Sequence, residues 1–218
     1  MKRKASTTPQ GPASKKPTLE RQGAVYGKAL YGGKNTGLAP ELKYNDVTFT
    51  DDATTTATVV SLTNFAAGDT ALLRDGNKIA PKSLNIRVKL TNEALTQSNV
   101  VRMMVVHDRQ PNNAAPTLSL VLDSQSPTGQ RLVGTASRFM ILCDEVIVLN
   151  ADGGTGAGVQ KAFWQKYLKL DPKLITSFLD GSAGEPYSNG LYLMYIGDVA
   201  AGATDCDVSG SCRLRFFG

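Results

Sequence analysis

The chain has 218 residues, 41% of them hydrophobic, which is enough to build one large β domain or two small ones around a core. No apolar run approaches the roughly 20 residues of a membrane helix, and the N-terminus lacks the apolar stretch of a secretory signal. The net charge of +5 is uneven, because residues 1–34 hold eight basic residues and one acid. That segment carries +7, which leaves −2 for the remainder, a slightly acidic body.

Residues 1–46 are predicted to form a basic, proline- and glycine-rich arm, and residues 47–218 the folded body. Within the arm, residues 1–22 contain three prolines and almost no apolar side chain, so we expect them to be disordered. Their two basic clusters resemble a bipartite nuclear localisation signal, which binds an import receptor. The residues predicted for this signal are Lys2, Arg3, Lys4, Lys15 and Lys16.

The same cations are candidates for nucleic-acid binding, since lysine and arginine on a flexible segment bind phosphates without reading sequence. The residues predicted for this role are Lys2, Arg3, Lys4, Lys15, Lys16, Arg21, Lys28 and Lys34. A solvated tail without a partner is the alternative. Residues 23–43 interleave tyrosines with lysines, which suits base stacking as well as docking of an extended arm on the body or on a neighbouring copy.

The body is expected to be all-β. Leu84, Ile86, Val88 and Leu90 alternate with polar residues, a period of two that predicts one buried and one wet face. Residues 99–108 are apolar on nearly both faces, as in a central strand. The predicted strands are Thr56–Leu62, Leu84–Leu90, Asn99–Asp108, Arg138–Leu149, Phe163–Leu170, Leu191–Ile196 and Ser211–Phe217, with Thr117–Leu122 a short strand or helical turn.

Long loops separate these strands, including Asp198–Gly210 and the turn Arg74–Lys78, which is expected to be solvated. About eight strands with connections longer than hairpin turns predict a single eight-stranded jelly roll, with two packed antiparallel sheets and Greek-key connections. Trp164 and Tyr167 stand among lysines. They are expected to be core residues beside solvated lysines, and a face for nucleic acid is the alternative.

The residues offer little for catalysis, cofactor binding or metal binding, and none of the three is predicted. The single histidine, His107, stands at a strand end and is interpreted as structural. Asp144 and Glu145 are adjacent in a strand and therefore point to opposite faces. No nucleophile, zinc or nucleotide-binding motif is present. Three cysteines without C-x-x-C spacing favour a reducing compartment; Cys143 and Cys212 are expected to be buried, and a Cys206–Cys212 bridge stays open.

Five segments carry a family resemblance: LLRDGNKIAPKSLNIRVKL, VVRMMVVHDRQPNNAAPT, GTASRFMILCDE, GLYLMYIGD and SCRLRFFG. They resemble capsid proteins of the circular Rep-encoding single-stranded DNA viruses, the circovirus-like group. The resemblance implies a T=1 icosahedral shell of sixty copies in the virion, single-stranded DNA as cargo, and entry into the host nucleus. It implies no enzyme and no membrane partner.

This arm is shorter and richer in lysine than the arms of that group. Sixty arms of +7 would balance on the order of 400 phosphates, so a longer genome would need help from the inner wall or from counterions. Arg87, Lys89 and Arg102 stand on strand faces suited to a wall or a subunit interface.

Three alternatives remain beside a DNA-virus capsid. A satellite plant-virus capsid has the same plan with RNA. A host nuclear β-sandwich protein would call for an acidic tract, and a cupin-type protein for clustered histidines; the chain has neither.

Overall fold

The computed structural model describes residues 41–92, 97–151, 160–202 and 204–218. These residues form nine strands and two single-turn 3-10 helices, and none of their helices is long and apolar enough to cross a membrane. The strands are β1 (Leu42–Ala53), β2 (Thr58–Ser61), β3 (Lys78–Asn92), β4 (Asn99–Asp108), β5 (Phe139–Leu149), β6 (Gln160–Lys169), β7 (Thr176–Ser177), β8 (Gly190–Gly197) and β9 (Cys206–Phe217). The helical turns are η1 (Leu118–Leu120) and η2 (Val133–Thr135).

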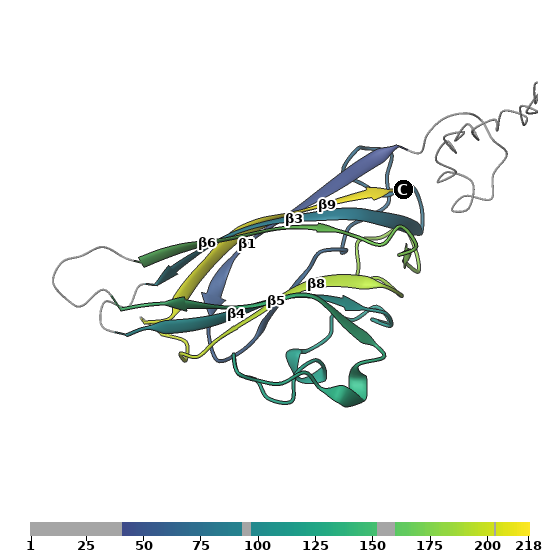
Figure 1. The fold of residues 1–218 in the computed structure, drawn as a ribbon. Helices are drawn as coiled ribbons and strands as arrows, with labels where there is room; N and C mark the ends of the chain where they lie inside the picture. Colours follow the sequence, from purple (N-terminus) through teal and green to yellow (C-terminus); the bar gives the residue numbers. More distant parts are fainter. Residues whose placement is uncertain (1–40, 93–96, 152–159, 203) are drawn as a thin grey trace, which may run out of the picture. The chain divides into compact units, whose positions relative to one another are not determined.

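Eight of the strands form two packed antiparallel sheets (Figure 1). Sheet A has the order β1-β9-β3-β6, with the short β7 beside β3, and sheet B has the order β2-β8-β4-β5. The chain passes from one sheet to the other at most connections, so most strands that are neighbours in a sheet are distant in sequence, with β4 and β5 as the exception. This is the predicted jelly roll, with its two sheets and Greek-key connections.

The main core lies between the sheets and follows the predicted alternation. Leu84, Ile86, Val88 and Leu90 of β3 are at most 1% exposed and form one side of the core. Sheet B contributes Val101, Met103 and Val105 of β4, together with alternate residues of β8, to the other side. Apolar burial of this kind stabilises a domain by about 25 cal/mol per Å² removed from water.

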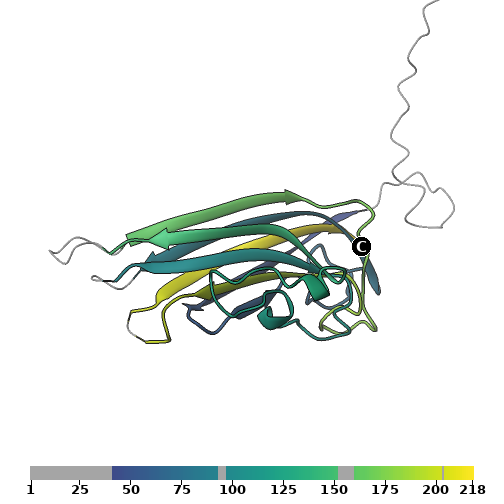
Figure 2. The same cartoon turned by 60° about the horizontal axis from the view of Figure 1, so that its bottom comes forward.

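A second core lies on the outer face of sheet B. Residues 109–138, which include both helical turns, fold back over β4, β5 and β8, as Figure 2 shows. Met104 and Val106 of β4 are therefore fully buried beneath Leu118 and Val121. The apolar character of both faces of β4 thus has a physical reason, since each face meets a separate core.

Three sequence predictions are corrected. The sheet begins at Leu42 rather than near Val47, and β9 begins at Cys206, so residues 206–210 are strand rather than loop. Both segments are rich in small or polar residues, and long-range pairing between β1 and β9 decides their conformation.

The third correction concerns Arg74, which is not in a solvated turn. Its side chain is fully buried and donates to the carbonyl oxygens of Phe65 (3.1 Å) and Ser182 (3.0 Å), with its guanidinium 4.0 Å from the Phe178 ring centroid. Burial lowers its pKa. Arg74 ties the β2–β3 connection to residues 178–182, a contact that local sequence does not indicate.

The three cysteines are free thiols. Cys206 and Cys212 lie six residues apart on the extended β9, a separation of about 20 Å, so no bridge between them is possible. Both are buried, whereas Cys143 is half-buried. Burial raises the pKa of each of the two buried thiols to about 12, which keeps them protonated and unreactive.

Candidate nucleic-acid interface

All residues predicted for nuclear localisation and nucleic-acid binding lie outside the described part of the chain. They are Lys2, Arg3, Lys4, Lys15, Lys16, Arg21, Lys28 and Lys34. Their two roles therefore stay predictions. The described part nevertheless offers a surface with the chemistry that such a partner needs.

That surface is the outer face of sheet A. The registers of β9, β3 and β6 place matching residues side by side in rows across the sheet. Lys89 stands between Ser209 and Phe163, and Arg87 stands between Ser211 and Gln165. One row further along, Asn85 stands between Arg213 and Tyr167. Cations, aromatic rings and small polar side chains thus share one face of the sheet.

The cations of this face are only partly paired, and the exposed Arg215 of β9 has no ion pair with another described residue. On the β1 half, Arg213 forms a two-bonded ion pair with Asp46, at 2.7 and 2.6 Å, and stacks 4.6 Å from the Tyr44 ring centroid. The hydrogen bond from Arg213 lowers the pKa of Asp46. The charges of Arg213 and Asp46 therefore neutralise each other within the molecule.

The β3–β6 half carries Arg87, Lys89, Lys161 and Lys169, and we call these four the cationic half-face. All four are exposed, and the outward positions of β3 and β6 include no carboxylate among the described residues. None of the four forms an ion pair with another described residue. Their charge is available to an external anion.

A hollow of about 330 Å³ lies within this half of the sheet. Arg87, Val88 and Lys89 of β3 line its middle, with the small Ser209–Ser211 stretch of β9 on one side and Phe163 and Gln165 of β6 on the other. Phe163 is 70% exposed. The hollow therefore combines cations, an open aromatic ring and small hydroxyl side chains.

The aromatic residues of β6 face opposite sides of the sheet. Trp164 is in the core and donates from Nε1 to Glu145 Oε2 at 2.8 Å, whereas Phe163 and Tyr167 face outward. Tyr167, expected in the core, is 66% exposed. A strict period of two along residues 161–169 would have predicted this difference. It places Phe163, Gln165 and Tyr167 on the same face as Lys161 and Lys169, and Trp164 on the opposite face.

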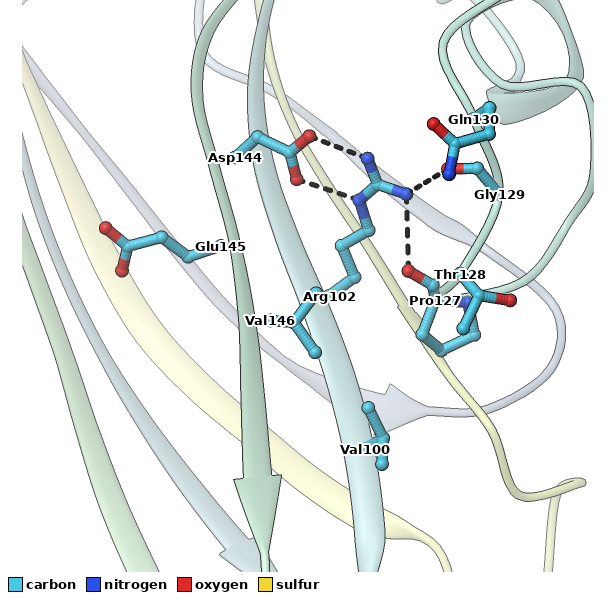
Figure 3. Close-up of a pocket in the computed structure, with 9 residues that line it drawn as sticks. All are labelled: Val100, Arg102, Pro127, Thr128, Gly129, Gln130, Asp144, Glu145 and Val146. Carbon is cyan, nitrogen blue, oxygen red and sulfur yellow. Dashed lines mark hydrogen bonds and ion pairs between the residues drawn. The ribbon is translucent and has the colours of Figure 1, made fainter.

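The outer face of sheet B has a different hollow, of about 480 Å³ (Figure 3). At its centre Arg102 forms two bonds with Asp144, at 2.8 and 2.6 Å, and donates to the carbonyl oxygens of Pro127 (3.2 Å) and Gly129. The bonds to Asp144 raise the pKa of Arg102. Arg102, a candidate for wall or interface in the sequence, is 9% exposed and already fully used inside the molecule.

The paired carboxylates diverge, as the strand geometry predicts. Asp144 faces Arg102, whereas Glu145 points away from it (Figure 3). Glu145 instead pairs with Lys166 and accepts from Trp164, both of β6. In the described residues no group of three or more His, Cys, Asp or Glu side chains is arranged to hold a metal ion. His107 is buried, with Nε2 3.1 Å from Asn189 Oδ1, in agreement with a structural role.

Comparison with known proteins decides the family. The sequence model of the satellite tobacco necrosis virus coat protein matches residues 39–212. The chain belongs to this family. It is therefore a viral coat protein, a structural component of the virion rather than an enzyme, and coat proteins assemble with copies of themselves. The match agrees with the satellite-virus alternative better than with the circovirus-like group.

Solved structures show weaker likeness. A capsid chain of Desmodium yellow mottle tymovirus is 17% identical, with a TM-score of 0.37, and the match covers 84% of this chain and 91% of that one. Two infectious bursal disease virus structures, of the Gx strain and of the VP2 subviral particle, are 12% and 9% identical, each with a TM-score of 0.28. These matches cover 83% and 81% of this chain but about a third of those chains, 32% and 33%. No curated protein matches the chain.

Proposed function

We propose that the chain is the coat protein of a small satellite-type virus and forms a T=1 shell of sixty copies around single-stranded RNA. The observation that carries this proposal is the family match over residues 39–212, since satellite plant-virus capsids enclose RNA. The jelly roll, with both sheets complete in the described residues, supports a role as a shell unit.

The charge distribution supports a shell that encloses nucleic acid. The arm residues Lys2, Arg3, Lys4, Lys15, Lys16, Arg21, Lys28 and Lys34 are proposed to neutralise phosphates. Sixty arms of +7 balance on the order of 400 charges, and four cations of the half-face on each copy add on the order of 200 more. The cationic half-face is therefore proposed to line the inside of the shell.

A circular single-stranded DNA genome is the second candidate, favoured by the five segments that resemble circovirus-like capsids and by the two basic clusters of the arm. In this case Lys2, Arg3, Lys4, Lys15 and Lys16 direct the chain to the host nucleus through an import receptor. Replacement of all five by alanine would then abolish nuclear accumulation of the labelled chain. An unchanged distribution would contradict the import proposal.

The deciding experiment is electron microscopy of the purified full chain, with absorbance at 260 and 280 nm on the same fraction. We expect uniform spherical particles with a high 260/280 ratio, and extracted nucleic acid that ribonuclease degrades and deoxyribonuclease does not. Degradation by deoxyribonuclease alone would favour the second candidate. A monomer or small ring would overturn the shell.

A further inference from the structure

The hollow on the outer face of sheet A has the size and lining of a site for one nucleotide. Its volume of about 330 Å³ is at the small end of the range for ligand pockets, which runs from about 300 to 1,000 Å³. It exists because Ser209, Gly210 and Ser211 are small, while the neighbouring strands carry long side chains. Gly210 contributes only its backbone, because a Cβ there would point to the core side of β9, within 2.9 Å of the Phe49 ring and 2.7 Å of the Arg87 carbonyl oxygen, so this position accepts only glycine.

The groups around the hollow match the parts of a nucleotide. Phe163 offers an open ring on which a base can stack, and every base has such a face. Arg87 and Lys89 are cations without an ion-pair partner among the described residues, which suits a phosphate. Gln165, Ser209 and Ser211 form no side-chain hydrogen bond with another described residue, so they are free to bond a sugar or a base edge.

An exposed ring also indicates which form of nucleic acid fits. Bases in a duplex are stacked on one another and cannot lie on a protein ring, whereas unpaired bases can. Tyr167, 66% exposed on the same side of β6, offers a second ring about 13 Å further along the strand. The face therefore suits an unpaired segment rather than a double helix.

We propose that this hollow binds one unpaired nucleotide of the packaged strand, with the base on Phe163 and the phosphate at Arg87 and Lys89. The proposal rests on the proposed function, because it makes this face the inner wall of the shell. The site accepts RNA and DNA alike, since stacking and phosphate contact are common to both.

The first test is ultraviolet crosslinking of intact particles, followed by trypsin digestion and mass spectrometry. Trypsin releases residues 162–166 as one peptide, in which only Phe163 and Gln165 border the hollow and Trp164 is buried. We expect a nucleotide adduct on Phe163. Adducts confined to peptides of the arm would overturn the site while leaving the shell proposal intact.

The second test measures binding of a labelled single-stranded oligouridylate and of a matched RNA duplex to the full-length chain, and so does not depend on particles. Phe163→Ala is expected to weaken single-strand binding about tenfold or more, with duplex binding and salt dependence unchanged. The double variant Arg87→Ala/Lys89→Ala is expected to lower the salt slope by about 1.4, the value for two phosphates of a single strand.

Matched controls lie elsewhere on the surface. Tyr187→Ala removes a ring that is 51% exposed, and Lys78→Ala/Lys173→Ala removes two exposed lysines; both are expected to bind like the wild type. Unchanged binding by Phe163→Ala would overturn the proposal. Loss of assembly by Phe163→Ala with binding intact would also overturn it, by making this face a contact between copies of the chain.

Discussion

The two outer faces of the jelly roll use similar residues for opposite purposes. On sheet B, residues 109–138 cover the side chains of Phe139 and Arg102. Phe139 packs in the second core, and Arg102 bonds to Asp144 and to the carbonyl oxygen of Pro127. On sheet A, Phe163 and Arg87 stand in outward positions that no described segment covers, and both are exposed. An outward phenylalanine or arginine on a strand is therefore not informative by itself, and the presence of a covering segment decides whether it stabilises the fold or remains available to a partner.

The phenylalanines provide the largest contrast. Phe139→Ala would open a cavity in the second core, where the side chain is 1% exposed, and is expected to lower the free energy of unfolding by about 3–4 kcal/mol. Phe163→Ala is expected to change it by less than about 0.5 kcal/mol, because the ring is already in water. Urea unfolding of the disassembled chain, followed by fluorescence of the single tryptophan Trp164, measures both.

Equal losses of unfolding free energy in Phe139→Ala and Phe163→Ala would contradict the difference between the two outer faces. A large loss from Phe163→Ala would mean that the ring is covered in the free chain and cannot serve a nucleotide. A small loss from Phe139→Ala would mean that residues 109–138 do not pack on sheet B in solution.

The arginines give the next contrast. Arg102→Ala would leave the Asp144 carboxylate unpaired and two carbonyl oxygens without a donor. We expect a loss of about 2–3 kcal/mol, below the 3–5 kcal/mol typical of a fully buried pair, because the Asp144 side chain is 32% exposed. Arg87→Ala, its control on sheet A, is expected to stay within about 0.5 kcal/mol.

Arg102→Ala has a local readout as well. Its bonds to Pro127 and Gly129 hold the covering segment to β4, so trypsin should cut the variant faster at the exposed Arg131. Unchanged cleavage together with unchanged stability would show that the bonds from Arg102 to Pro127 and Gly129 are not formed in solution.

Local patterns predict the fold better than they predict this contrast. The period of two in Leu84–Leu90 and the double apolar character of β4 are sufficient to predict two sheets and a buried central strand. Strand β1 was missed, because its alternation is weak and its pairing partner lies at the other end of the chain. Arg74 was placed in solvent, because nothing near it in sequence indicates the carbonyl oxygen of Ser182 that it bonds.

The candidate site was only partly predictable for the same reason. Alternation along residues 161–169 separates the outward Phe163 and Tyr167 from the inward Trp164, so the orientation of these three side chains could be predicted from the sequence. The hollow itself depends on β9 lying beside β3, which brings Ser209–Ser211 next to Arg87. Strand order of this kind comes from the topology and not from any local pattern.

The smallest expected effect concerns His107, which points between the two sheets and so belongs to neither outer face. Burial lowers its pKa, while the bond to Asn189 and the charge of Asp108 oppose the shift and Arg109 adds to it. Below its unfolded pKa of about 6.5 the unfolded chain binds a proton that the folded chain does not. Stability is therefore expected to fall as the pH falls from 6.5 toward 5, by at most about 1.4 kcal/mol per pH unit.

His107→Gln should flatten that slope, as measured by urea unfolding at several pH values. Carboxylates with lowered pKa, such as Asp46 and Glu145, lose their contribution only at lower pH, and the pKa of Asp52, raised by burial, gives a pH dependence of opposite sign, so the difference between wild type and His107→Gln isolates the histidine. Because His107 stands beside Leu191 of the main core between the sheets, Trp164 fluorescence and cleavage at Arg131 should report the same loss. An equal slope in the variant would assign the pH dependence to another group, and a loss in only one of the two signals would mean that the two faces unfold separately.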